Sequence, residues 1–209
     1  MKSIAIIGLG YVGLPLAVEF GKKYQTTGFD VSRMRISQLK KFIDVTGEVD
    51  KKNLKKSKKL SFSFNQKSIK NCNIFIITVP TPINEINKPD LKILKEALKI
   101  VGTNLSKNCT VVLESTVYPG TVEEVCVPIL EKESGLKLNK DFFMGYSPER
   151  INPGDKKHYL TNITKIVSGS NKRTVSELSK LYGSIIKAKI YKSPSIKVAE
   201  AAKVIENCQ

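Results

Sequence analysis

Residues able to do chemistry gather in the loops that follow apolar, strand-like segments of the sequence. In an open α/β sheet the ligand lies across the carboxyl ends of the strands, so side chains at these places would face one crevice. Each also has a simpler interpretation, because the hydroxyl residues can cap helices and the charged ones can be ordinary loop charges. The residues concerned are Thr81, Ser115, Thr116, Glu149 and Arg150.

A lysine and an asparagine near the end of the sequence lie on one face of a predicted helix. Lys203 and Asn207 are four residues apart, and side chains with this spacing are neighbours on a helix surface. Glu200, three residues before Lys203, could simply pair with it. Spacing alone therefore leaves open whether this face is functional or solvated.

Few residues are available for histidine-dependent or metal-dependent catalysis. His158 is the only histidine, so a Ser-His-Asp triad or a multi-histidine metal site has little to build from. We expect proton transfer to use a carboxylate, a lysine or water, and we expect no metal. The cysteines lack the spacing of metal motifs and are expected to be reduced, mostly small core residues. They are Cys72, Cys109, Cys126 and Cys208.

A glycine pattern after the first apolar run indicates a dinucleotide site. Gly8, Gly10 and Gly13 form Gly-x-Gly-x-x-Gly, and Asp30 follows the last of them by seventeen residues. Between a strand and a helix, these glycines permit a tight turn, close approach to a pyrophosphate and close packing of the helix. Asp30 would accept hydrogen bonds from ribose hydroxyls and repel a 2′-phosphate, which favours NAD over NADP. Arg35 lies nearby and weakens that preference without reversing it.

Strand and helix signals alternate along the chain, which predicts an α/β fold with a Rossmann-type, doubly wound, mostly parallel sheet. Strands are expected near residues 3–8, 26–30, 60–64, 73–79, 110–114, 142–146, 163–168 and 188–192. Helices are expected near residues 11–23, 31–42 (with Ser32 as the cap), 91–105, 119–134, 171–182 and from 193 onward. Residues 44–59 are polar and irregular, with room for a short helix. The last helix carries no stop signal after Asn207, so we expect the sequence to be the amino-terminal part of a longer protein.

The composition is that of a globular protein with a strong positive charge. The net charge of +16 invites a nucleic-acid interpretation, but the excess is nearly all lysine spread along the chain, so we expect no nucleic-acid partner. The field would still attract anionic ligands such as nucleotides. No uninterrupted apolar run of about 20 residues occurs, so no membrane span is expected.

Five motifs in order resemble the UDP-glucose/GDP-mannose dehydrogenase family, the nucleotide-sugar 6-dehydrogenases. They are Gly8 to Pro15, Val79-Pro80-Thr81-Pro82, Glu114-Ser115-Thr116-Val117, Ser147-Pro148-Glu149-Arg150 and Glu200-Ala201-Ala202-Lys203. The stretch from Ser147 to Gly154 is most similar to the branch that acts on UDP-2-acetamido-hexoses. Glucose-type members carry a second glutamate where Pro153 stands here, so the role of that glutamate does not carry over.

The resemblance implies a set of roles for individual residues. The implied NAD site consists of Gly8, Gly10, Tyr11, Val12, Gly13, Asp30, Arg35, Pro80, Thr81, Ser115 and Thr116. Thr116 and Glu149 would order the catalytic water and handle protons, while Lys203, with Asn207 beside it, would stabilise negative charge on the C6 oxygen. Glu149, Arg150, Lys203 and Asn207 would meet the substrate, Arg150 from across a dimer.

The resemblance also implies how this chain fits a whole enzyme. Residues 1–193 would form the NAD-binding domain and residues 194–209 the start of a long connecting helix, with the middle and UDP-binding domains absent. The family's nucleophilic cysteine is expected downstream of residue 209, so this chain alone would not turn over. The complete protein would be a cytoplasmic homodimer or higher oligomer that oxidises the C6 alcohol of a UDP-2-acetamido-hexose to the acid for surface or capsular polysaccharide. The alternatives are a non-catalytic NAD-binding module and another NAD-dependent dehydrogenase, acting on UDP-glucose, GDP-mannose or a β-hydroxyacid.

Overall fold

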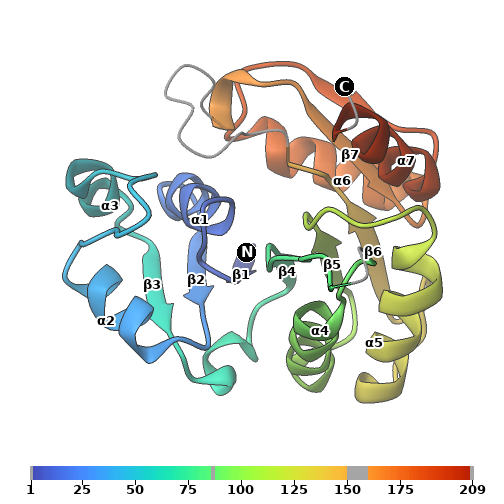
Figure 1. Ribbon diagram of the computed structural model, residues 1–209, viewed down its shortest axis with the longest axis horizontal. Helices are drawn as coiled ribbons and strands as arrows, with labels where there is room; N and C mark the ends of the chain where they lie inside the picture. Colours follow the sequence, from blue (N-terminus) through green and yellow to red (C-terminus); the bar gives the residue numbers. More distant parts are fainter. Residues whose placement is uncertain (1, 86–87, 150–159, 208–209) are drawn as a thin grey trace.

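The computed structural model describes residues 2–85, 88–149 and 160–207. Within these residues the chain forms an eight-stranded sheet in the order β3-β2-β1-β4-β5-β6-β7-β8 (Figure 1). All neighbouring strands are parallel except β6 and β7, which are antiparallel. The strands are β1 (Ser3–Ile7), β2 (Gln25–Phe29), β3 (Leu60–Ser63), β4 (Ile74–Ile77), β5 (Cys109–Leu113), β6 (Phe142–Tyr146), β7 (Lys165–Gly169) and β8 (Ile190–Lys192).

Helices cover both faces of the sheet, as the alternating sequence signals predict. Figure 1 shows α1 (Gly13–Gly21) and α6 (Lys172–Gly183) on one side, and α4 (Lys92–Asn104) and α5 (Val127–Ser134) on the other. Each side has its own apolar cluster, because central parallel strands are buried on both faces. The other helical segments are α2 (Arg33–Lys40), α3 (Lys51–Lys56), η1 (Gln66–Ile69), the π-helical η2 (Val122–Cys126), η3 (Leu160–Asn162) and α7 (Ile196–Asn207).

The predicted fold class is confirmed, and the differences lie at the element ends. The first helix begins at Gly13 instead of near residue 11, because Gly10 to Val12 form the turn that leaves β1. Ser32 caps α2 as predicted, since its side chain accepts a hydrogen bond from the Arg35 N–H. The strands β7 and β8 each begin two residues later than expected. The single helix expected after Pro119 is divided into η2 and α5.

The reversed direction of β7 decides which of its ends reaches the ligand edge of the sheet. Tyr146, the last residue of β6, pairs with Ser168, near the end of β7. The start of β7 at Lys165 therefore extends past the carboxyl end of β6. This antiparallel pairing puts an amino-terminal strand residue at the edge where the parallel strands β1, β4 and β5 place their carboxyl ends.

Three cysteine thiols are reduced and buried in the core, as expected from their spacing. Cys72, Cys109 and Cys126 all belong to the apolar cluster that includes α4 and α5. Burial raises the pKa of each thiol, and that of Cys126 reaches about 12. Cys208 lies outside the described residues.

Candidate functional site

A cleft of about 770 Å³ runs along the carboxyl edge of the sheet. It lies where β1 and β4 are neighbours although the chain passes through β2 and β3 between them. Such a reversal of strand order is where open α/β sheets bind ligands. The cleft is lined by Gly8, Leu9, Gly10, Tyr11, Val12, Asp30, Thr78, Val79, Pro80, Thr81, Pro82, Glu114, Ser115, Thr116, Glu149 and Lys203.

The three motif glycines meet different steric demands. Gly8 has a positive φ of 93°, which L side chains rarely adopt. A Cβ on Gly13 would lie 1.9 Å from the Gly8 carbonyl oxygen, so only glycine lets α1 start this close to β1. A Cβ on Gly10 would have no neighbour within 4 Å, so this position stays open toward the cleft. Glycine at this position is therefore not needed for packing, which leaves ligand approach as its reason.

Asp30 holds the glycine-rich loop in place as well as lining the cleft. Its Oδ2 accepts a hydrogen bond from the Leu9 N–H at 2.8 Å, and its Oδ1 accepts one from the Ser32 N–H at 2.9 Å. A carboxylate has about four lone-pair sites, so each oxygen keeps one for a further donor such as a ribose hydroxyl.

Arg35 lies beneath the glycine-rich loop, and among the described residues it is not part of the cleft lining. Its side chain is 10% exposed, its Nε donates to the Leu9 carbonyl at 3.0 Å, and its Nη1 forms an ion pair with Asp44 at 2.7 Å. Burial acts to raise the pKa of Asp44, but hydrogen bonds from Thr46, Val49 and Arg35 outweigh it and lower the pKa. Arg35 therefore ties the loop after α2 to the loop after β1.

The hydroxyl residues after β4 and β5 join their two loops. The Thr81 hydroxyl donates to the Thr116 carbonyl at 2.5 Å, and the Ser115 hydroxyl donates to the Val79 carbonyl at 2.5 Å. Ser115 is buried, whereas Thr116 is exposed in the cleft. Neither hydroxyl bond caps a helix, so the simpler interpretation of Thr81 and Ser115 does not describe this structure.

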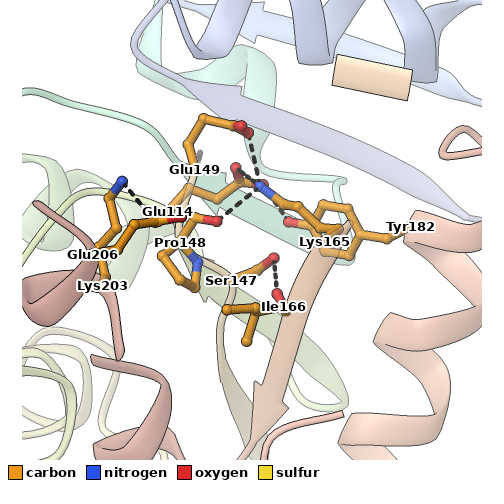
Figure 2. A network of polar contacts seen from close by, with 9 residues as sticks. All are labelled: Glu114, Ser147, Pro148, Glu149, Lys165, Ile166, Tyr182, Lys203 and Glu206. Carbon is orange, nitrogen blue, oxygen red and sulfur yellow. Dashed lines mark hydrogen bonds and ion pairs between the residues drawn. The ribbon is translucent and has the colours of Figure 1, made fainter. Parts of the chain in front are cut away.

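A buried network of charges lies at the end of the cleft away from Asp30. Figure 2 shows the Lys165 ammonium between two carboxylates. Its Nζ lies 2.6 Å from Glu114 Oε2 and 2.8 Å from Glu149 Oε2. The Tyr182 hydroxyl donates to the other Glu114 oxygen at 2.5 Å. Glu114 and Glu149 line the cleft, whereas Lys165 lies behind them with 3% of its side chain exposed.

Burial and charge act in opposite directions within this network. Burial alone would lower the pKa of Lys165, but Glu114 and Glu149 outweigh it and hold that pKa above its usual range. For Glu114, burial dominates and raises the pKa, although the Lys165 charge and the Tyr182 hydrogen bond act against it. Burial, followed by the charge of Glu114, raises the pKa of Tyr182, which therefore stays a hydrogen-bond donor.

The last helix reaches the cleft through Lys203 and is fixed to the body of the domain by Glu200. The fully buried Glu200 carboxylate accepts hydrogen bonds from the Gly120 N–H at 2.6 Å and the Val122 N–H at 2.9 Å. Lys203 lines the cleft and lies 3.4 Å from Glu206. Glu200 thus bonds to the start of η2 and the residues just before it. Lys203 therefore pairs with Glu206 and not with Glu200.

The sequence-predicted residues divide into three groups. Most of them line one cleft, namely Gly8, Gly10, Tyr11, Val12, Asp30, Pro80, Thr81, Ser115, Thr116, Glu149 and Lys203. Gly13 is not among the lining residues and instead lets α1 pack closely against the loop. Arg35 supports the cleft from below. Arg150, Pro153 and His158 lie outside the described residues. Asn207 is the last residue of α7, but the structure does not describe its side chain.

Sequence reasoning missed the roles of Lys165, Tyr182 and Asp44. The lysine at the start of a buried strand was the available signal for Lys165, since a buried lysine must be paired. Nothing in the local sequence of Tyr182 indicates its contact with Glu114, which is 68 residues away.

The residues present fit a dinucleotide. In the described part of the chain, no protein acceptor takes the N–H of Tyr11 or Val12, and both residues line the cleft. Free N–H groups at a helix amino terminus suit a pyrophosphate, and the carboxylate of Asp30 suits a ribose diol. The fold and the cleft therefore define a dinucleotide-binding domain of the Rossmann type.

The chain belongs to the UDP-glucose/GDP-mannose dehydrogenase family. Residues 2–186 match the NAD binding domain of this family, and the cofactor of the domain is NAD. A UDP-N-acetyl-D-glucosamine 6-dehydrogenase from Salmonella typhi is 58% identical over 99% of the chain, and one from Pseudomonas aeruginosa is 56% identical over the same share. The match covers 48% and 49% of these two relatives, so the chain spans about half their length.

Solved structures agree with this assignment. The structure of a UDP-D-ManNAc dehydrogenase from Pyrococcus horikoshii superposes with a TM-score of 0.91 at 32% identity. The match covers 99% of this chain and 50% of that one. No helix in the described part of the chain is both long and apolar enough to cross a membrane.

Proposed function

We propose that this chain is the cofactor-binding half of an enzyme that oxidises the C6 alcohol of a UDP-2-acetamido-hexose to the carboxylate. The observation that carries the proposal is the composition of the cleft. It joins a dinucleotide-binding end, built by Gly10 and Asp30, to a charged end with Glu149 and Lys203. Cofactor and reacting alcohol would therefore meet in one continuous space.

The charged end supplies groups of the kind that alcohol oxidation needs. Bound NAD accepts a hydride, while the alcohol proton must pass to a base. Glu149 would take up that proton directly or through a water held with the Thr116 hydroxyl. The Lys203 ammonium would stabilise the negative charge that develops on the C6 oxygen.

The choice of substrate is supported by the relatives. The two relatives above, at 58% and 56% identity, are named for UDP-N-acetyl-D-glucosamine. We therefore propose UDP-N-acetylglucosamine, or a close epimer of it, as the substrate and surface polysaccharide synthesis as the use of the product. Cys72, Cys109 and Cys126 are buried away from the cleft lining, so the second oxidation would need a cysteine nucleophile that the described residues do not supply.

The test has two parts because binding and turnover make different demands on the chain. The 209-residue chain should bind NAD in a calorimetric titration. The complete gene product should form two NADH for each UDP-N-acetylglucosamine consumed, and GDP-mannose or a β-hydroxyacid should give much less. NAD binding without NADH formation from any nucleotide sugar would refute the proposed oxidation and favour a non-catalytic NAD-binding module.

A further inference from the structure

Lys165 is a buried cation whose place in the structure needs a reason beyond packing. An apolar side chain at the start of β7 would avoid the cost of taking an ammonium out of water. The lysine instead bridges Glu114, at the end of β5, and Glu149, in the loop after β6 (Figure 2). It thus links two buried carboxylates of the cleft wall that come from different loops.

On the Glu114 side, the bridge is held by contacts with residues of the core. The Tyr182 hydroxyl holds Glu114 at 2.5 Å, and the Tyr182 ring packs edge-on against Phe20 with centroids 5.8 Å apart. The Lys165 Nζ also lies 5.5 Å from the centre of the Tyr182 ring. Because these contacts come from β5, α6 and α1, the position of the ammonium is set by the core and not by the cleft.

We propose that Lys165 is a positioning residue that fixes the Glu149 carboxylate on the wall of the cleft and favours its ionised form, with Glu114 and Tyr182 anchoring Lys165. The inference rests on the proposed function only for what Glu149 does with the substrate. The antiparallel direction of β7 makes the arrangement possible, because it brings an amino-terminal strand residue to this edge. A loop glutamate would then keep one orientation toward the alcohol, as efficient proton transfer requires.

The charges around Glu149 explain why the loss of Lys165 should change the protonation of the Glu149 carboxylate. The Lys165 ammonium contacts the Glu149 carboxylate at 2.8 Å and the Glu114 carboxylate at 2.6 Å. Its opposite charge at hydrogen-bond distance favours the ionised form of Glu149, whereas burial and the like charge of Glu114 act against that form. Removing the ammonium should therefore make Glu149 take up its proton at a higher pH. Among the described residues, the charged and titratable groups that Figure 2 shows near Glu149 are Glu114 just after β5, Lys165 on β7, Tyr182 on α6, and Lys203 and Glu206 on α7.

The direct test follows the Glu149 carboxyl carbon by ¹³C NMR as the pH is lowered, in the 209-residue chain, with Glu149→Gln to assign the signal. In Lys165→Met the carboxylate should take up its proton at a pH higher by about 1 unit or more. In Lys165→Arg, which keeps the charge, the midpoint should return toward that of the wild type. Lys192→Met, the same substitution at an exposed position on the neighbouring strand β8, should leave it unchanged.

A second variant keeps the test valid if Lys165→Met alone fails to fold. Lys165→Met combined with Glu114→Gln removes the cation and one of its two anions together, so Glu149 is the one carboxylate of the bridge left without the lysine. The Glu149 midpoint should still rise, because the nearer attraction is lost along with the more distant repulsion. An unchanged or lowered midpoint in either variant, or no recovery with arginine, would overturn the proposal.

Activity provides an independent arm in the complete gene product. Lys165→Met should move the rising limb of the kcat pH profile to higher pH, and Lys165→Arg should restore it. If the wild-type protein forms no NADH from any nucleotide sugar, the proposed oxidation fails. The NMR titration still decides whether Lys165 positions Glu149.

Discussion

At the scale of single residues, Asp30 does two jobs with one carboxylate. It accepts the Leu9 and Ser32 N–H groups and so shapes the glycine-rich loop, while it also lines the cleft. We expect its remaining lone pairs to accept hydrogen bonds from a ribose, and its charge to oppose a 2′-phosphate. We therefore expect the choice between NAD and NADP to be coupled to the shape of the loop.

Replacing Asp30 should affect both the loop and the cofactor preference. Asp30→Ala should weaken NAD binding by about tenfold or more, because a charge-assisted hydrogen bond contributes roughly 1.5–3 kcal/mol. It should also narrow the preference for NAD over NADP. Asp30→Asn is the nearest isosteric comparison, since it keeps one acceptor oxygen for the loop but loses the other acceptor and the charge. Calorimetric titration with both cofactors measures the effect, and unchanged affinity and preference in Asp30→Ala would remove this residue from the site.

Two glycines of the same motif should respond differently to alanine. Gly13→Ala puts a Cβ 1.9 Å from the Gly8 carbonyl oxygen, so it should lower the free energy of unfolding by about 1–3 kcal/mol. Gly10→Ala meets no neighbour within 4 Å, so it should leave stability nearly unchanged while weakening NAD binding. Urea unfolding and NAD titration of both variants test this. A destabilised Gly10→Ala protein with normal NAD affinity would contradict the assignment.

At the scale of elements, α7 is attached by the buried Glu200 carboxylate as well as by apolar packing of Ile196 and Ala199. Glu200→Ala would leave the buried N–H groups of Gly120 and Val122 without their acceptor. We expect the free energy of unfolding to fall by about 1–3 kcal/mol for this loss.

Lys197→Ala, on the same helix, is the control for Glu200→Ala. It removes only an exposed ion pair with Glu124 and should change stability by less than about 1 kcal/mol. Equal effects of the two substitutions, measured by urea unfolding, would show that Glu200 does not hold the helix.

Most elements could be predicted from the sequence because their signals are local. The glycine-rich turn, the Ser32 cap and the apolar strands each lie within a few residues of their own evidence. The direction of β7 is not local, since it is set by how the chain returns to the sheet after β6. The charge network escaped prediction for the same reason, because Lys165 and Glu114 are 51 residues apart and meet only in the folded domain.

At the scale of the whole molecule, the buried network should make the free energy of unfolding fall at alkaline pH. The pKa of Lys165 is held above its usual 10.5 by the two carboxylates, against the effect of burial, and the pKa of Tyr182 is raised above 10.0 chiefly by burial. The unfolded chain would give up these protons at a lower pH than the folded chain. Above about pH 10 the folded state therefore holds more protons, and its stability falls as pH rises.

The substitution Tyr182→Phe tests this pH dependence. Each group contributes a slope of up to about 1.4 kcal/mol per pH unit, so removing the phenol should flatten the loss of stability above about pH 10. Urea unfolding of wild type and variant at several pH values gives the two slopes. A variant that loses stability as steeply as the wild type would show that Tyr182 does not contribute.

The three core thiols give the domain a built-in reporter of its own opening. A thiol-specific reagent attacks only exposed thiolate, and Cys72, Cys109 and Cys126 are buried with raised pKa values. Modification of these residues should therefore proceed only as fast as the sheet and its covering helices separate. Labelling followed by mass spectrometry would time that separation residue by residue, and NAD should slow it if ligand binding stabilises the closed domain.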